Sequence, residues 1–550
     1  MKVQRSKKRG VYAATVVGLW LVSGCWLTSA QPGSKTQQEM DMSARFLVLS
    51  PTCARCHTAV DTAKALWNED GEDISPVGTW NASVMANSFT DPYWRAQMER
   101  ERAAAGEADV TAITELCTRC HAPAAIHENR LEGIAPPTLA QLDADPAAHE
   151  GVTCTVCHRM NGDGFGEERT FHGNLVLDGE ANLYGPYPDP FPGPMANMSG
   201  YNIHFGAHMV ESALCGTCHT LETGHGDALF LEQSPYLEWR NSIFSHEAGS
   251  PFSRSCQDCH MEAKGDTMLA HNPGGGDFPF LEPRPAVRSH GIMGGNARLL
   301  DMLRMGREEL GVRASADELA EMAAATRHFL GSESAMVEIE PGDTSKDHLR
   351  FAVRVENRTG HKLPSGYPSR RAWLEVTVQS GGETWFASGV PDKAGRIVPQ
   401  GKDFDLPHYQ VIERAEQVQV YELVALDKAG KTTTQLSAMA TQAKDNRLLP
   451  RGWSKEGPHA ERTAPVGVDE DDDFTGGEDW VWYDLEIPAE VRATGKAPMV
   501  SARLLFQTIP PGWADAHRGV DSPASQRFLK LYDAAEVHYE VLAEARRVVR

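Results

Sequence analysis

The chain has 550 residues, of which 41% are hydrophobic, and a formal net charge of -22. This length allows two or three domains with substantial cores and excludes a small scaffold held together by disulfides. The negative charge makes the chain a poor ligand for phosphate backbones, so we expect no nucleic-acid partner, and it suits transient docking with basic partner proteins.

The first 24 residues have the order of an export signal. A basic start precedes an apolar run over residues 11–22, which is too short and wrongly flanked for a stable membrane span. The run ends in Leu21-Val22-Ser23-Gly24-Cys25, which resembles the lipobox of bacterial lipoproteins. We therefore expect lipidation of Cys25 and a lipid anchor in the bacterial cell envelope, at the outer membrane or the periplasmic face. An ordinary signal peptide with an incidental cysteine is the alternative.

The other ten cysteines all belong to five Cys-x-x-Cys-His motifs. These are Cys53/Cys56/His57, Cys117/Cys120/His121, Cys154/Cys157/His158, Cys215/Cys218/His219 and Cys256/Cys259/His260. Two thiols at this spacing add to both vinyl groups of one haem, and the adjacent histidine becomes an axial ligand of the iron. A single motif would also fit a redox disulfide or half of a zinc site. Five copies that use every remaining cysteine predict a multihaem cytochrome with five haems c.

The chain divides by composition after the last motif. We expect residues 25–295 to form a pentahaem domain of helices and irregular segments, with a Gly-, Pro- and aromatic-rich loop over residues 161–206 wrapped around cofactors. A capping box from Ser315 to Glu318 and leucines at helical spacing predict a helical connector over residues 296–335.

From residue 336 onward, short runs alternate between hydrophobic and polar residues and are separated by turns. This pattern predicts an all-β domain over residues 336–550, an immunoglobulin-like sandwich with a C-terminal helix starting near Ser525. The domain has no cysteine and therefore no covalent haem. Its acidic run over residues 469–473 fits a calcium loop or a solvated loop, and the solvated loop is the commoner case.

Two segments resemble elements of known multihaem cytochromes. Residues 80–86, Trp-Asn-Ala-Ser-Val-Met-Ala, are similar to a W-x-x-S-x-H-A element of bacterial cytochromes related to hydroxylamine oxidoreductase and the tetrahaem cytochrome of nitrifiers. Residues 359–366, with Gly360-His361-Lys362-Leu363-Pro364, resemble a G-H-x-x-P-T-G element in β-domains of multihaem cytochromes, and residues 444–447 fit that pattern too. The resemblance implies electron transfer and no particular substrate. Met85 stands where those relatives have a histidine.

Each iron also needs an explanation of its sixth coordination position. Candidate distal ligands are Met85, His172, His208, His290 and His361, with His408 as a weaker one. The resemblance implies roles for position 85 and for His208, which we expect on a helix before the fourth motif. His361 lies in the β-domain and could reach a haem of the other domain. The alternatives are that Met85 is an apolar contact of porphyrin, that His361 bonds within its loop, and that the others are ordinary histidines.

Three functions fit these features. The leading one is electron transfer through five haems on an exported lipoprotein that serves redox partner proteins. The second is a multihaem oxidoreductase of small nitrogen or sulfur compounds, with one open-coordination haem. The third is a subunit of an outer-membrane conduit whose β-domain binds a partner. Five low-spin haems would favour the first function, and one high-spin haem would favour the second.

Overall fold

The computed structural model describes residues 46–107, 109–225, 228–397, 404 and 406–549. The expected signal peptide and Cys25 lie outside these ranges. From residue 45 onward the chain forms one compact unit. Within the described ranges no helix has the length and apolar character needed to cross a membrane.

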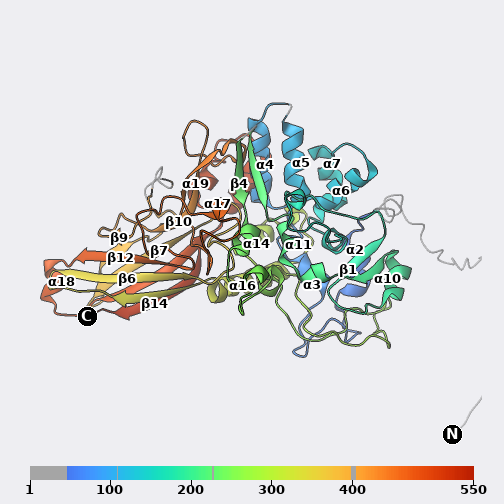
Figure 1. Cartoon of the computed structure of the whole chain (residues 1–550), viewed down its shortest axis with the longest axis horizontal. Helices are drawn as coiled ribbons and strands as arrows, with labels where there is room; N and C mark the ends of the chain where they lie inside the picture. Colours follow the sequence, from blue (N-terminus) through green and yellow to red (C-terminus); the bar gives the residue numbers. More distant parts are fainter. Residues whose placement is uncertain (1–45, 108, 226–227, 398–403, 405, 550) are drawn as a thin grey trace, which may run out of the picture. The chain divides into compact units, whose positions relative to one another are not determined.

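The region that carries the five motifs consists of short helices joined by long loops (Figure 1). The helices are α2 (Ser50–His57), α3 (Pro76–Asn81), α4 (Pro92–Ala104), α5 (Val110–His121), α6 (Pro123–Glu132), α7 (Leu139–Ala144), α8 (Pro146–His149), α9 (Cys154–His158), α10 (Pro192–Ser199), α11 (Ser212–Gly216), α12 (Pro235–Arg240) and α13 (Cys256–His260). Many of them begin with proline, whose fixed φ suits the first helical position. Strands β3 (Leu221–His225) and β4 (Ala228–Gln233) form a hairpin after the fourth motif.

The predicted loop over residues 161–206 is more ordered than expected. Strands β1 (Asn182–Gly185) and β2 (Asn202–Phe205) pair in parallel, and α10 lies between them in the chain. Leu183 of β1 packs with Val48 from the start of the described chain. The turn-rich composition conceals these strands because their partners are distant in sequence.

The helical connector agrees with its prediction. It comprises α14 (Ala297–Met305), α15 (Arg307–Leu310) and α16 (Ala316–Glu333). The Ser315 hydroxyl accepts a bond from the Glu318 amide at 3.1 Å, and the Glu318 carboxylate accepts one from the Ser315 amide at 2.7 Å. This reciprocal capping box satisfies two amides at the start of α16.

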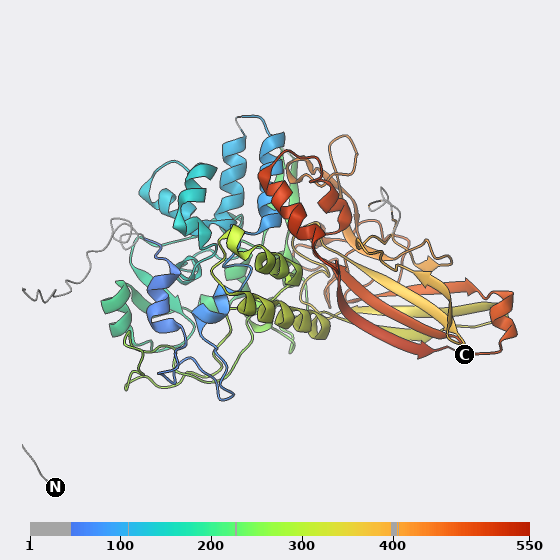
Figure 2. The same ribbon diagram turned by 180° about the vertical axis from the view of Figure 1, so that it is seen from behind.

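The C-terminal region consists of two sheets that share a core (Figures 1 and 2). Its strands are β5 (Ala335–Pro341), β6 (His348–Asn357), β7 (Arg371–Ser380), β8 (Glu383–Ser388), β9 (Val411–Ile412), β10 (Val420–Leu426), β11 (Thr441–Asp445), β12 (Glu478–Glu486), β13 (Met499–Gln507) and β14 (Glu540–Val548). One sheet has the order β11-β10-β7-β13-β14 with β8 beside β7, and the other has the order β5-β6-β12-β9. Val353, Val376 and Val481 from both sheets are fully buried in the shared core.

The end of the chain differs from its prediction. The expected helix is present as α20 (Pro523–Asp533), which packs against α4, but the chain then continues into β14. Strand β14 pairs antiparallel with β13 at the edge of the larger sheet. Its Ala, Glu and Arg residues are good helix formers, and the pairing overrides that preference. The short helices α17 (Ala460–Thr463), α18 (Ala489–Ala493) and α19 (Pro511–Asp515) lie between the later strands.

Candidate functional site

All five motifs open onto one continuous cavity. Its volume is about 2320 Å³, and all ten motif cysteines and all five motif histidines line it. None of these cysteines forms a disulfide. Pockets for single small molecules usually measure about 300–1,000 Å³, so this cavity suits several large ligands.

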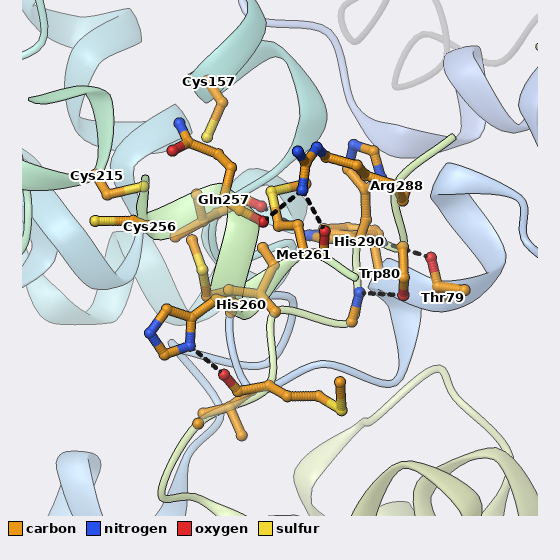
Figure 3. Close-up of a pocket in the computed structure, with 18 of the residues that line it drawn as sticks. Thr79, Trp80, Cys157, Cys215, Cys256, Gln257, His260, Met261, Arg288 and His290 are labelled. Carbon is orange, nitrogen blue, oxygen red and sulfur yellow. Dashed lines mark hydrogen bonds between the residues drawn. The ribbon is translucent and has the colours of Figure 1, made fainter. Parts of the chain in front are cut away.

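The motifs are neighbours in space. Their thiols face one another in the pairs Cys53 with Cys154, Cys120 with Cys218, and Cys215 with Cys256, and Cys157 lies close to the fourth motif. Figure 3 shows the thiols of Cys157, Cys215 and Cys256 together in one part of the cavity. The fourth motif therefore adjoins the second, third and fifth, and the first motif adjoins the third.

The motif histidines are oriented by the backbone. In four of them Nδ1 donates to a backbone carbonyl: His57 to Leu269 (2.8 Å), His121 to Ser88 (3.0 Å), His158 to Tyr184 (2.7 Å) and His260 to Met293 (2.5 Å). This arrangement is typical of metal-binding histidines, because it fixes the ring and leaves Nε2 for the metal. Burial lowers the pKa of His121 and of His260 to about 4, so both rings are neutral. His219 instead hydrogen-bonds with the side chain of Gln233.

Two further histidines face motif histidines across the cavity. The ring centres of His158 and His290 lie 6.3 Å apart with planes 22° apart, and those of His260 and His361 lie 6.2 Å apart with planes 12° apart. A metal–nitrogen bond of about 2.0 Å on each side, with about 1.1 Å from nitrogen to ring centre, places two axial imidazoles roughly 6 Å apart. Both pairs therefore have the spacing of axial ligands on one metal.

The two distal rings are also held through Nδ1. His290 bonds to the carbonyl of Arg288 at 3.1 Å, and His361 bonds to the carbonyl of Lys362 at 2.8 Å. Both histidines are partly buried, and loss of solvation lowers the pKa of His290 to about 4 and also lowers that of His361. His361 reaches the cavity from the loop after β6, so the β-region contributes directly to the fifth motif's surroundings.

His208 and His172 are placed differently from the sequence-based expectation. His208 lies on a single 3-10 turn, η2 (Ala207–Val210), and its Nε2 donates to the Met160 carbonyl at 2.9 Å. His172 lies with its Nε2 4.0 Å from the Glu222 carboxylate. Neither side chain lines the cavity. In this structure each ring is directed to another partner, and the roles of His208 and His172 as iron ligands stay predictions.

Met85 and one histidine that the sequence did not single out also line the cavity. The Met85 carbonyl accepts a bond from the amide of Val152 at 3.0 Å, just before the third motif. Its role as an iron ligand stays a prediction. The missed histidine is His328 on α16, where it shares a cavity-facing stripe with Met322 and Ala325. The three-residue spacing of this stripe was a detectable signal.

A partly buried cation completes the lining. Arg370 donates to the Ser365 carbonyl at 2.8 Å and to the Asn296 side chain at 2.7 Å, while its Nε has no partner. Burial lowers the pKa of Arg370 to about 10, against the attraction of the Asp91 carboxylate, with which it forms no direct ion pair in the described structure. Haem propionates would add further anions beside this cation. Thiols, paired imidazoles and a cation without a direct ion pair together fit haem as the resident group.

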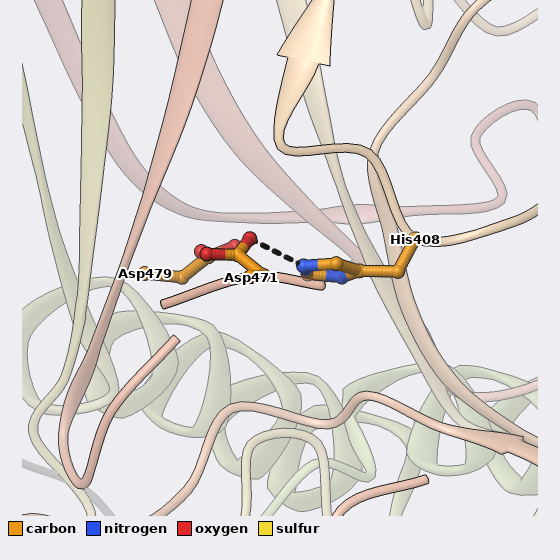
Figure 4. A group of neighbouring side chains, drawn as sticks. All are labelled: His408, Asp471 and Asp479. Atoms are coloured by element: carbon orange, nitrogen blue, oxygen red, sulfur yellow. Dashed lines mark hydrogen bonds and ion pairs between the residues drawn. The ribbon is translucent and has the colours of Figure 1, made fainter. Parts of the chain in front are cut away.

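The acidic run contributes to a buried cluster in the β-region (Figure 4). Asp471 is buried, and its Oδ2 lies 2.8 Å from Nε2 of His408. Ligand atoms of His408, Asp471 and Asp479 lie within 4.8 Å of one another, which is a spacing that a metal ion could use. The part of the run that contains Asp471 is therefore not the solvated loop that composition favours.

The hydrogen bonds around His408 exclude a metal at its Nε2. Nδ1 accepts bonds from the side-chain amides of Gln419 (2.8 Å) and Asn446 (3.0 Å). Backbone amides of Tyr409 and Glu422 bond to the carbonyl oxygens of these two side chains and fix their orientation. Since Nδ1 accepts, Nε2 must carry the proton that it donates to Asp471. His408 is therefore part of a structural network and not a haem or metal ligand.

Sequence comparisons with protein-family models and with curated proteins found no match. Among solved structures, the chain is similar to a penta-haem cytochrome c552 from Thermochromatium tepidum, with a TM-score of 0.54 and 18% sequence identity. The similarity covers 92% of this chain and 99% of that chain. This chain has the fold of a multihaem cytochrome. Because the match extends over nearly the whole length, it includes the β-region as well as the motif-bearing region.

Proposed function

We propose that the protein carries five covalently bound haems c and transfers electrons. The observation that carries this proposal is the convergence of ten motif thiols and five motif imidazoles on one cavity. Bound haem supplies reversible one-electron chemistry at the iron, and the protein supplies ligands, burial and orientation. The similarity in fold to a penta-haem cytochrome supports the same reading.

In this proposal the motif residues and two further histidines of the cavity have defined roles. The motif cysteines attach the groups, and the motif histidines hold the irons from one side. His290 and His361 complete the coordination opposite His158 and His260. The fourth motif would hold the central group, because its thiols adjoin those of three other motifs.

We also propose the expected cellular setting. Cleavage before Cys25 and its lipidation would anchor the protein in the bacterial envelope, at the outer membrane or the periplasmic face. The net charge of -22 suits redox partners with basic docking surfaces. An immunoglobulin-like classification of the two C-terminal sheets belongs to the same set of proposals.

The test is an intact-mass measurement combined with electron paramagnetic resonance of the oxidised holoprotein. We expect five haems, and we expect His290→Ala and His361→Ala each to convert one low-spin haem to high spin. A mass corresponding to fewer than five haems, or spin states unchanged in both variants, would contradict the proposal.

A specific observation favours the oxidoreductase as a second candidate function. Hydroxyls of Tyr93, Tyr367 and Thr223 and one oxygen of Glu232 are buried on the cavity wall, where Tyr93 interacts with Tyr367 and Ser369 and Thr223 interacts with Glu232, but none of these contacts is a well-formed hydrogen bond. The rings of Tyr93 and Tyr367 lie 5.8 Å apart in an edge-to-face arrangement, and Glu232 lies near the thiol of Cys117 in the second motif. Burial raises the pKa of Glu232 to about 8, so at neutral pH it is largely protonated and can donate a hydrogen bond. Such donors would orient a small oxygen-bearing nitrogen or sulfur compound beside the second haem.

Cyanide titration of the oxidised holoprotein tests this second function. An open second haem should bind cyanide in the native protein, and Tyr367→Phe should weaken that binding by about 5-fold, the effect of one hydrogen bond of roughly 1 kcal/mol. If Tyr367→Phe and Glu232→Gln both leave cyanide binding unchanged, these side chains have another partner, such as a propionate. That result would contradict a substrate site beside the second haem.

A further inference from the structure

Four charged residues are buried together behind the His361 loop. Glu238 is 0% exposed, Lys362 and Asp445 are each 1% exposed, and Arg447 is 7% exposed. Asp445 bonds Lys362 Nζ at 2.6 Å and Arg447 Nε at 2.7 Å, while Arg447 lies 3.5 Å from Glu238. The two carboxylates balance the two cations, as burial of charged groups requires.

Glu238 connects the motif-bearing region to the His361 loop of the β-region. It lies on α12, and its Oε2 accepts bonds from the backbone amide of Lys362 at 3.0 Å and from the Ser365 hydroxyl at 2.6 Å. The carbonyl of Lys362 in turn accepts the Nδ1 proton of His361 at 2.8 Å. Lys362 is thus held at two points, its amide by Glu238 of the motif-bearing region and its Nζ by Asp445. Its carbonyl in turn orients the His361 ring.

The β-region holds the other side of the same turn. The His361 carbonyl accepts bonds from the side chains of Asn357 and Thr359, both at 2.8 Å. Leu363 and Leu448 exchange backbone bonds of 2.9 and 3.0 Å. These contacts fix the turn within the β-region, whereas Glu238 fixes it relative to α12 and therefore relative to the cavity.

We propose that Glu238 is a positioning residue that holds His361 at the distal side of the iron bound by His260. This inference rests on the proposed function, in which His361 is an axial ligand. Groups that orient a metal-binding histidine affect how firmly it binds the metal. Loss of the Glu238 carboxylate releases the Lys362 amide and leaves an unbalanced buried charge, so His361 leaves the iron more readily.

The experiment uses the full-length oxidised holoprotein and measures two quantities. The first is the number of high-spin haems, and the second is the rate of cyanide binding in each variant compared with the native protein. We expect His361→Ala to add one high-spin haem and Glu238→Ala to raise the cyanide-binding rate by about 10-fold, equivalent to roughly 1.4 kcal/mol. Glu238→Gln should give a smaller increase, because its amide oxygen still accepts from the Lys362 amide.

Glu422→Ala is the matched control. Glu422 on β10 and Lys444 on β11 form a buried pair at 2.8 Å in the sheet that also contains Asp445, and in the described structure neither side chain hydrogen-bonds to the turn around His361. This variant should lose stability without a change in spin state or cyanide rate. If Glu238→Ala and Glu238→Gln bind cyanide at the native rate while His361→Ala gains a high-spin haem, the positioning role is overturned. An equal rate increase in Glu422→Ala would also overturn it. If His361→Ala itself keeps the native spectrum, the failure lies in the proposed function.

Discussion

At the scale of single residues, the histidines of this chain differ in which ring nitrogen bonds to the protein. His57, His158, His290 and His361 bond through Nδ1 to backbone carbonyls, which leaves Nε2 for a metal. His208 uses Nε2 for a backbone carbonyl and has none of this geometry. The carbonyls that hold His57 and His158 come from other segments, whereas those that hold His290 and His361 lie within two residues of the ring.

Met85→His tests the predicted methionine ligand. A thioether stabilises ferrous iron relative to imidazole, so the variant should lower the highest of the five potentials by on the order of 100 mV and remove any sulfur-to-iron charge-transfer band. Potentiometric titration with optical detection measures both effects. Met85→Leu is the companion variant, because it removes the sulfur while keeping an apolar side chain, and it should also abolish the band. A band that survives either substitution would show that Met85 is only an apolar contact.

Asp479→Asn tests the buried cluster beside His408. Burial raises the pKa of Asp479 to about 6 from an ordinary 3.8, so the unfolded chain ionises first as the pH rises. The folded state therefore loses about 2 kcal/mol of stability between pH 4 and pH 7 that the variant does not lose. The side-chain oxygen of Asn can still accept from Tyr421, which lies 2.7 Å from Asp479. Thermal unfolding midpoints should favour the variant increasingly from pH 4 to pH 7, and a constant difference would contradict the assignment.

At the scale of elements, local patterning located the connector helices, α20 and the strands β6, β7, β10, β12 and β13, and it missed β14. The strand joins β13 at a sheet edge and also packs against α16 and β5. Its inward residue, Leu542, is 0% exposed in the core shared by the two sheets. Nothing in the local composition marks this segment as a strand, because the pairing partner supplies the preference.

Leu542→Ala should therefore reduce the free energy of unfolding by about 2–5 kcal/mol, as truncation of buried leucines does. Chemical denaturation of the holoprotein measures this loss. Val541→Ala on the same strand is the matched control, since Val541 is 37% exposed and should lose far less. Equal losses in the two variants would contradict the inward placement of Leu542.

At the scale of the whole molecule, the β-region supplies part of the cavity onto which the five motifs open. Its loop after β6 contributes His361, Tyr367 and Arg370 to the lining, and α20 packs against α4 of the motif-bearing region. The two regions accordingly belong to one compact unit and not to two tethered domains.

A form of the protein that ends at Glu333 should contain five haems but at least one more high-spin haem than the full chain. The physical reason is the loss of His361 from the cavity. Resonance spectra and potentials of the two forms provide the measurement, with full-length His361→Ala as the comparison for loss of the ligand alone. Identical spin states and potentials in all three proteins would contradict ligation by His361.

The sequence by itself determined the five motifs on which the proposed haem attachment rests, because two thiols and an adjacent histidine lie within five residues. It also located the connector helices, including the Ser315 capping box, and five strands of the C-terminal sheets, since their periodicity is local. Tertiary structure alone decided which imidazoles face each other. His260 and His361 come from opposite regions of the chain, and Glu238 and Asp445 from still other segments fix the turn between them. Neighbouring carbonyls orient the His290 and His361 rings, and only contacts between distant segments bring those rings to the cavity opposite the motif histidines.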